Sequence, residues 1–255
     1  MANNGSDSGV VPAIDTTTPQ EPEEKPFNPL DMLLAAAQQT TEEEPEPTEY
    51  GKLPVTEEEY MAAQGAFTPA QQNAVDVYLH PYKTNGTLYS PSQQINHALR
   101  TDQPVPYMYQ SAVAGMDGLM HDLGYNLNLT RYDRVGFIQR LLGGITHEGL
   151  SEQQLKSMLV GTKYQDPAFV STSHNNFVNA PPGNPFTDKT VEVRIKAGAG
   201  TQAMMPGNGA GGKLGEIVLG RNQWFKITDV KTPAGQYGRS GDKWYQKVII
   251  EVEVG

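Results

Sequence analysis

The 255-residue sequence contains no cysteine, which excludes disulfides, thiolate zinc sites and a cysteine nucleophile. Basic residues are also few, because 19 Lys and Arg stand against 29 Asp and Glu and give a formal net charge of -10. A protein that coats nucleic acid needs the opposite balance, so we expect no direct nucleic-acid binding. No apolar run approaches the roughly 20 residues of a membrane-spanning helix, and we expect no membrane contact.

Several functional motifs are missing as well. The N-terminal residues have neither the basic nor the apolar stretch of a secretory signal peptide. The histidines and aspartates show no spacing typical of metal ligands, so we expect no metal site. Gly207, Gly209 and Gly212 formally match a dinucleotide-binding fingerprint, but a strand-like segment follows where that fold requires a helix.

The acidity is concentrated near the N-terminus. Residues 1–60 hold 14 acidic residues, two lysines and eight of the 19 prolines, whereas residues 61–255 hold 15 acidic and 17 basic residues. Such a segment buries too little apolar surface to offset its ordering entropy, and we predict that 1–60 is disordered. A Leu/Met/Ala run near 29–38 predicts a short helix within it, either transient or docked on a partner.

Residues 65–255 have the length and composition of one folded domain. Thr68-Pro69, Ser90-Pro91 and a run from about Met108 to Leu123 predict three helices, so 67–124 forms a helical part. Residues 125–255 are mainly strand-like, with alternation starting at Leu127 and Leu129. Short helices are expected at 137–142 and 151–159, and later strands at 169–173, 191–195, 216–219, 224–227 and 248–252. Helices first and strands later indicate an α+β domain.

Three polar features fall on the predicted strands. Arg131 ends the Leu127–Leu129 strand, Ser171-Thr172-Ser173 follows Phe169, and Glu216 opens an apolar strand after a glycine-rich stretch. Each feature alone is more often an ordinary solvated surface. In this order, with 45 residues from Ser171 to Glu216, they resemble the arginine–serine–glutamate class of the ADP-ribosyltransferase superfamily, which includes actin-modifying binary toxins and phage-encoded transferases.

Further motifs extend the resemblance over residues 70–255. Tyr78 with Ile95-Asn96-His97-Ala98-Leu99-Arg100 is similar to the family's first helix pair, and residues 191–200 are similar to its strand that ends in glycine. Residues 216–227 resemble the family's signature around the catalytic glutamate.

The resemblance implies two small antiparallel sheets around a cleft that binds NAD as substrate, next to the helical part. Glu216 would stabilise the cationic ribose that forms when nicotinamide leaves, and Ser171 would hold that carboxylate. Arg131 would bind the diphosphate; Arg134 is the alternative, although we favour Arg131. The other implied NAD contacts are Asn96, Arg100, Thr172, Ser173 and Phe177, with Phe177 stacking on nicotinamide.

One position departs from the family pattern. Leu214 stands two residues before Glu216, where the family usually has the Glu or Gln that engages the acceptor. Three explanations remain open: another acceptor type, NAD hydrolysis without transfer, or a fold retained after loss of activity. Lys213 or Asn208, in the glycine-rich stretch 206–215, could substitute for the missing side chain.

These features together predict a mono-ADP-ribosyltransferase that modifies a protein acceptor. The acidic extension resembles that of phage transferases carried inside the virion, so we expect a virion or host-cytoplasm location and contacts with head or portal proteins. The alternatives are an NAD glycohydrolase and a non-catalytic virion structural or interaction protein that retains the fold.

Overall fold

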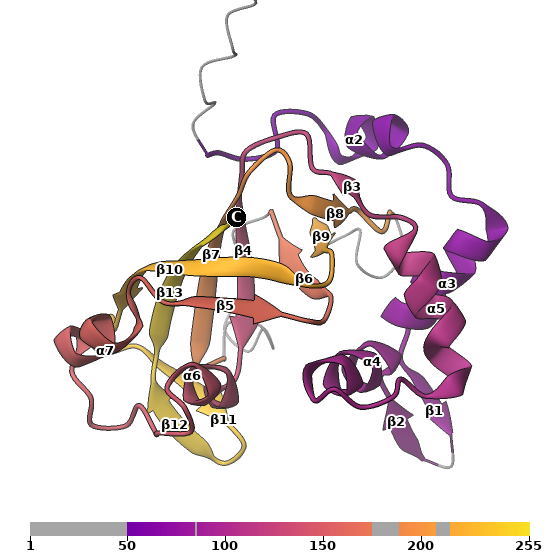
Figure 1. The fold of residues 1–255 in the computed structure, drawn as a ribbon. Helices are drawn as coiled ribbons and strands as arrows, with labels where there is room; N and C mark the ends of the chain where they lie inside the picture. The colour runs from indigo at the N-terminus through magenta and orange to yellow at the C-terminus, as the bar shows by residue number, and fades with distance from the viewer. Residues whose placement is uncertain (1–49, 85, 175–188, 208–214) are drawn as a thin grey trace, which may run out of the picture. The chain divides into compact units, whose positions relative to one another are not determined.

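The computed structural model describes residues 50–84, 86–174, 189–207 and 215–255, all within the unit formed by residues 47–255. The described helices are α2 (Glu57–Gln64), α3 (Pro69–Leu79), α4 (Pro91–Arg100), α5 (Tyr107–Asp117), α6 (Val135–Leu141) and α7 (Glu152–Leu159). The described strands are β1 (Tyr82–Thr84), β2 (Thr87–Tyr89), β3 (His121–Asp122), β4 (Leu127–Asp133), β5 (Lys163–Asp166), β6 (Val170–Ser173), β7 (Val191–Ala197), β8 (Gln202–Met204), β9 (Glu216–Leu219), β10 (Gln223–Lys231), β11 (Tyr237–Ser240), β12 (Lys243–Gln246) and β13 (Val248–Val254). The expected α+β class is confirmed (Figure 1). Among the described helices, none is both long and apolar enough to cross a membrane.

Nine of the described strands form one sheet in the order β3-β8-β9-β6-β4-β7-β13-β10-β5. A single register pair, Thr130 with Ser173, joins its first four strands to its last five. Neighbouring strands run antiparallel except β7 and β13, which are parallel. The expected two small sheets are therefore two halves that meet at one point, and the larger half contains a parallel pair.

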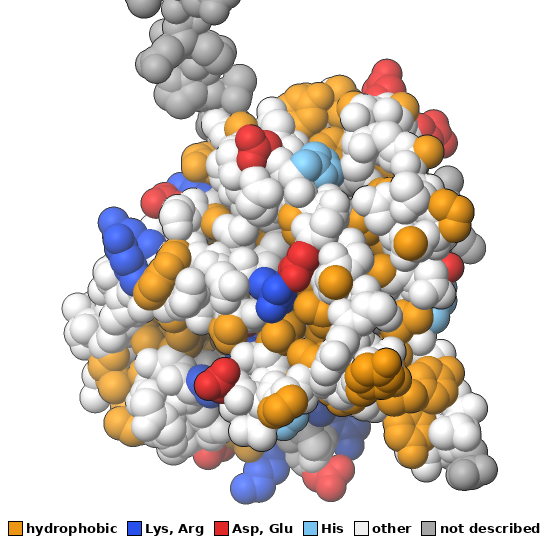
Figure 2. Space-filling view, turned by 45° about the vertical axis from the view of Figure 1, so that its right-hand side comes forward, with side chains coloured by type: hydrophobic (Ala, Val, Ile, Leu, Met, Phe, Trp, Pro, Cys, Tyr) orange, Lys and Arg blue, Asp and Glu red, His pale blue; other side chains and the backbone are white. Residues whose placement is uncertain are grey.

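The helical part contains a hairpin that the sequence analysis did not predict. Strands β1 and β2 pair between α3 and α4, with Gly86 at a φ of +76° in the turn. Asn-Gly between two short β-prone runs is a strong hairpin signal. The hairpin and the start of α5 expose large apolar side chains, including Leu88 at 61% and Tyr107 at 90% (Figure 2, lower right).

Helix α2 changes the expected boundary of the acidic segment. Residues 57–60, which composition assigned to that segment, begin α2 instead. Thr56 and Glu59 form a capping box, which satisfies backbone donors at the start of this helix. Tyr60 then anchors the helix to the sheet, with only 4% of its surface exposed.

Strands β6 and β9 separate two apolar cores. Ile217 and Leu219 pack in the larger core with α6 and α7, whereas Val218 packs with Phe169 against α3, α4 and α5. Side chains alternate along a strand, so Glu216 shares the face of Val218. The sequence therefore directs Glu216 toward the helical part of the molecule.

Candidate active site

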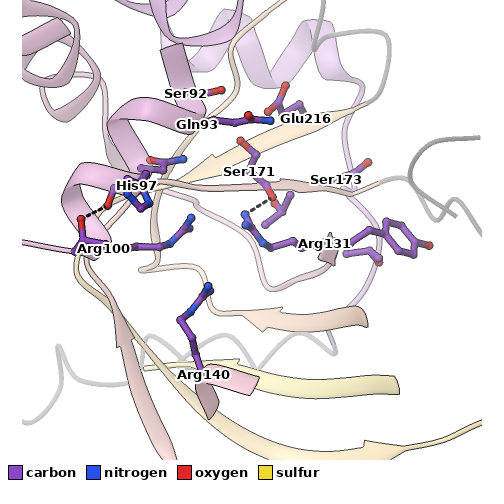
Figure 3. A pocket seen from close by; sticks show the side chains of 14 residues that line it. Ser92, Gln93, His97, Arg100, Arg131, Arg140, Ser171, Ser173 and Glu216 are labelled. Atoms are coloured by element: carbon purple, nitrogen blue, oxygen red, sulfur yellow. Dashed lines mark hydrogen bonds between the residues drawn. The ribbon is translucent and has the colours of Figure 1, made fainter. Parts of the chain in front are cut away.

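A cavity of about 660 Å³ lies between α4, the strands β4, β6 and β9, and α6 (Figure 3). Its lining residues are Ser92, Gln93, Asn96, His97, Arg100, Thr101, Thr130, Arg131, Tyr132, Arg140, Ser171, Thr172, Ser173 and Glu216. Most of them are polar, and three are arginines. The cavity is therefore suited to a polar, negatively charged ligand of small-molecule size.

Helix α4 supplies one side of the cavity through helical spacing. Ser92, Asn96 and Arg100 are four residues apart, and Gln93 and His97 form a parallel row. Residues four apart lie on one face of a helix, so all five side chains reach the same cavity.

Strands β6 and β9 bring the predicted serine and glutamate together. Ser173 lies directly opposite Glu216, and Ser171 lies one diagonal step away on the same face. Thr172 points the other way, and its hydroxyl donates to the Ile217 carbonyl at 2.7 Å. The Ser-Thr-Ser pattern thus directs two serine side chains into the site, whereas Thr172 also lines the cavity but turns its hydroxyl toward β9.

Glu216 is the end of a chain of hydrogen-bonded side chains. Burial raises the pKa of Glu216, and a hydrogen bond from Ser171 partly offsets that rise by favouring the ionised form. Ser171 also bonds to the hydroxyl of Tyr78, which is fully buried. Asn96 in turn donates to Tyr78 at 2.9 Å. The donors can run in one direction, from Asn96 through Tyr78 and Ser171 to the carboxylate.

Arg131 is held in the cavity by two partners. Its guanidinium donates to the Asp133 carboxylate at 3.0 and 3.2 Å and to the Ser171 carbonyl at 3.3 Å. Burial alone lowers the pKa of Arg131, but the Asp133 carboxylate outweighs it and the pKa is raised. Arg131 therefore keeps its positive charge beside Ser171.

The other two arginines of the cavity differ in their charge balance. Arg100 forms a two-point ion pair with Asp166 at 2.9 Å, so its charge is largely compensated. Arg140 projects from α6 toward the cavity (Figure 3), and it forms no ion pair with any residue that the structure describes. Arg140 therefore contributes an uncompensated positive charge to the cavity.

The remaining sequence-predicted residues have different outcomes. Arg134 is exposed at the N-cap of α6 and does not line the cavity, whereas Arg131 does. Phe177, Leu214, Lys213 and Asn208 lie outside the described residues.

Sequence reasoning missed Gln93, His97 and Arg140. For Gln93 and His97 the signal was available, because each lies three or four residues from Asn96 or Arg100 on the same helix. For Arg140 the sequence held no comparable signal, since only the packing of α6 on the sheet, where it contacts β7, directs it inward.

Arg131, Ser171 and Glu216 line one cavity in a fold of the ADP-ribosyltransferase superfamily. The sequence model of the ADP-ribosyltransferase exoenzyme family matches residues 54–254, and the chain belongs to this family.

Solved structures of bacterial toxins share the fold at low sequence identity. The C3 exoenzyme of Clostridium limosum is 18% identical with a TM-score of 0.58, covering 78% of this chain and 90% of that one. The enzymatic component C2-I of the Clostridium botulinum C2 toxin is 16% identical with a TM-score of 0.54, covering 78% of this chain and 46% of that one. C3stau2 from S. aureus, solved with NAD, is 15% identical with a TM-score of 0.53, covering 81% of this chain and 99% of that one. A search of curated protein sequences finds no match.

Proposed function

We propose that this protein is a mono-ADP-ribosyltransferase that cleaves the nicotinamide–ribose bond of NAD and transfers ADP-ribose to a protein acceptor. The observation that carries the proposal is the contact between Ser171 and Glu216 in a cavity that also holds Arg131. The family supports NAD as the substrate, and C3stau2 was solved with NAD.

The chemistry follows from the charges in the cavity. When the bond from ribose to nicotinamide breaks, its electron pair leaves with nicotinamide, and the ribose becomes an oxocarbenium-like cation. The Glu216 carboxylate stabilises that developing positive charge. The acceptor then donates a lone pair to the same ribose carbon, and its proton passes to solvent.

The surrounding side chains fit the rest of NAD. Arg140 supplies an uncompensated positive charge for the diphosphate. Arg131 is paired with Asp133, but its contacts with Asp133 and Ser171 use three of its five N–H groups, so two remain to donate to phosphate oxygens. The Oδ1 atom of Asn96 is buried and has no hydrogen-bond partner among the described residues. It can accept a hydrogen bond from a ribose hydroxyl of the bound substrate.

Nicotinamide release from NAD tests the proposal. Glu216→Gln keeps the shape of the side chain and removes its charge, so kcat should fall by about 100-fold or more. Glu253→Gln, which alters an exposed carboxylate on β13, is the matched control and should leave kcat unchanged. Wild-type protein that neither binds NAD nor releases nicotinamide would favour the non-catalytic alternative.

Leu214 favours a second candidate, an NAD glycohydrolase that transfers ADP-ribose only to water. Labelled NAD separates the two functions, because transfer places the label on protein and hydrolysis leaves it in free ADP-ribose. We expect the wild type to label a protein acceptor. Hydrolysis alone in the wild type, with protein labelling gained by Leu214→Glu, would support the glycohydrolase instead.

We further propose that the acidic N-terminal segment attaches the enzyme to head or portal proteins, so that it travels in the virion and acts in the host cytoplasm. Residues 1–46 lie outside the unit that carries the site, and they contain the Leu/Met/Ala run near 29–38. Deletion of 1–46 should abolish particle association and leave nicotinamide release intact. Unchanged association would refute the docking role.

A further inference from the structure

Helix α2 is linked to both ends of the connection between β8 and β9, directly at one end and through His174 at the other. Met205 is the first residue after β8, and Gly215 is the last residue before β9, which begins with Glu216. Met205 contacts α2 directly through Gln64, whereas Gly215 is linked to α2 through His174 and Glu57. Gln64 and Glu57 lie at opposite ends of that helix.

Gln64, the last residue of α2, holds the first end. Its side-chain amide donates to the Met205 carbonyl at 2.9 Å and accepts from the Met205 amide at 2.9 Å. Both backbone groups of Met205 are thus satisfied by one side chain, in the way that a neighbouring strand would satisfy them. Met205 is also buried, with 1% of its surface exposed.

Glu57, the first residue of α2, holds the second end through His174. The Glu57 carboxylate lies 2.9 Å from the Nε2 atom of His174. The backbone amide of His174 donates to the Gly215 carbonyl at 3.1 Å, and the preceding residue, Ser173, is the register partner of Glu216. A displacement of His174 therefore acts directly on the backbone at Glu216.

The helix between these two contacts is a fixed spacer. Seven residue steps separate Glu57 from Gln64, which corresponds to about 10 Å along a helix axis. The capping box at Thr56 fixes the start of α2, and buried Tyr60 fixes its rotation against the sheet. Neither contact can shift without the other unless α2 itself deforms or moves.

We propose that Gln64 and Glu57 are positioning residues for the reaction, because α2 holds the residue that follows β8 and the residue that follows β6, the two strands that pair with β9, and so sets the place of the Glu216 carboxylate. This inference rests on the proposed function of Glu216. The contacts of α2 should affect the turnover number and not the affinity for NAD, since the NAD-binding residues Arg131 and Asn96 lie on other elements.

Gln64→Met tests the first contact, because methionine keeps the side-chain length and removes both hydrogen bonds. Gln72→Met is the matched control. Gln64, Gln72 and Met205 all line a second cavity of about 540 Å³, but the Gln72 amide bonds to Asp76 on its own helix and not to Met205. Calorimetric titration with NAD gives the affinity and the number of binding sites, and nicotinamide release then gives kcat per site. Misfolded protein binds no NAD and so does not alter kcat per site.

For Gln64→Met we expect kcat per site to fall by about tenfold, because small displacements of a reacting group are costly, while the Kd for NAD stays within about twofold. Gln72→Met should match the wild type in both. Glu57→Met tests the second contact, because methionine removes the oxygen that bonds to His174, and it should lower kcat per site in the same way. Glu58→Met, at the exposed neighbouring position, should not.

If Gln64→Met does not fold, the comparison of Glu57→Met with Glu58→Met tests the same inference through the second contact. An active wild type with unchanged kcat per site in the folded α2 variants would overturn this inference alone. A wild type that releases no nicotinamide would overturn the proposed function and this inference together.

Discussion

Tyr78 links the helical part to the catalytic strand, so we expect Tyr78→Phe to reduce both stability and turnover. Its hydroxyl is fully buried, accepts from Asn96 at 2.9 Å and bonds to Ser171. A hydrogen bond contributes about 0.5–1.5 kcal/mol net, and a buried donor left without a partner costs about 1–3 kcal/mol. Loss of the hydroxyl removes two hydrogen bonds and leaves the Asn96 amide without its partner. The free energy of unfolding should therefore fall by about 2–3 kcal/mol.

Equilibrium urea unfolding measures the stability loss, and nicotinamide release should fall by about tenfold because Ser171 loses the donor that orients it. Tyr109→Phe is the matched control: Tyr109 is also buried, but its hydroxyl bonds to Tyr82 outside the cavity, at 3.0 Å. Tyr109→Phe should lower the free energy of unfolding by about 1 kcal/mol and leave the rate of nicotinamide release unchanged. A Tyr78→Phe protein with less than about 0.5 kcal/mol of lost stability and wild-type turnover would refute the role of this hydrogen-bond chain.

Three further predictions follow from the packing and charges. A Cβ at Gly115 would clash with the Cβ of Ala74, so Gly115→Ala should lower the free energy of unfolding, measured by thermal unfolding, by about 1–3 kcal/mol. A Cβ at Gly136 meets open space, so Gly136→Ala should leave that free energy unchanged. Burial raises the pKa of Glu216 in the folded protein above its value in the unfolded chain. Protonated Glu216 therefore stabilises the fold at low pH, and this stabilisation is lost as the pH rises through the raised pKa. Glu216→Gln should therefore raise Tm by on the order of 2 °C at pH 7 and not at about pH 3.5; an equal rise at both would contradict the linkage. Arg131→Lys keeps the charge but removes the paired N–H donors of the guanidinium, and calorimetry should show NAD binding weakened by about 10–100-fold. An unchanged affinity would mean that other residues bind the diphosphate.

Local sequence signals predicted the elements that carry most of the site. The apolar run after Glu216 corresponds to β9, and the alternation at Leu127 corresponds to β4 with Arg131 in it. The helix expected at 151–159 corresponds to α7, which begins where the Ser151 side chain accepts from the Gln154 amide. These signals are local because hydrophobic alternation and helix capping depend only on neighbours in sequence.

The rest depended on contacts between distant residues. Strands β5 and β8 are only four and three residues long, and their partners β10 and β9 stabilise them rather than their own patterns. The ion pair of Arg100 with Asp166 joins residues 66 positions apart, so the sequence could not show that its charge is compensated. Helix α2 was missed because its acidic composition outweighed the Thr56 capping signal, and burial of Tyr60 decides its fold.

The position of NAD bound to the slow Glu216→Gln protein shows directly whether this cavity is the active site. A crystal structure of that complex should place the nicotinamide-bound ribose between Ser171 and residue 216, with the diphosphate on Arg131. NAD bound outside this cavity, or a diphosphate held by Arg134 in place of Arg131, would contradict the account.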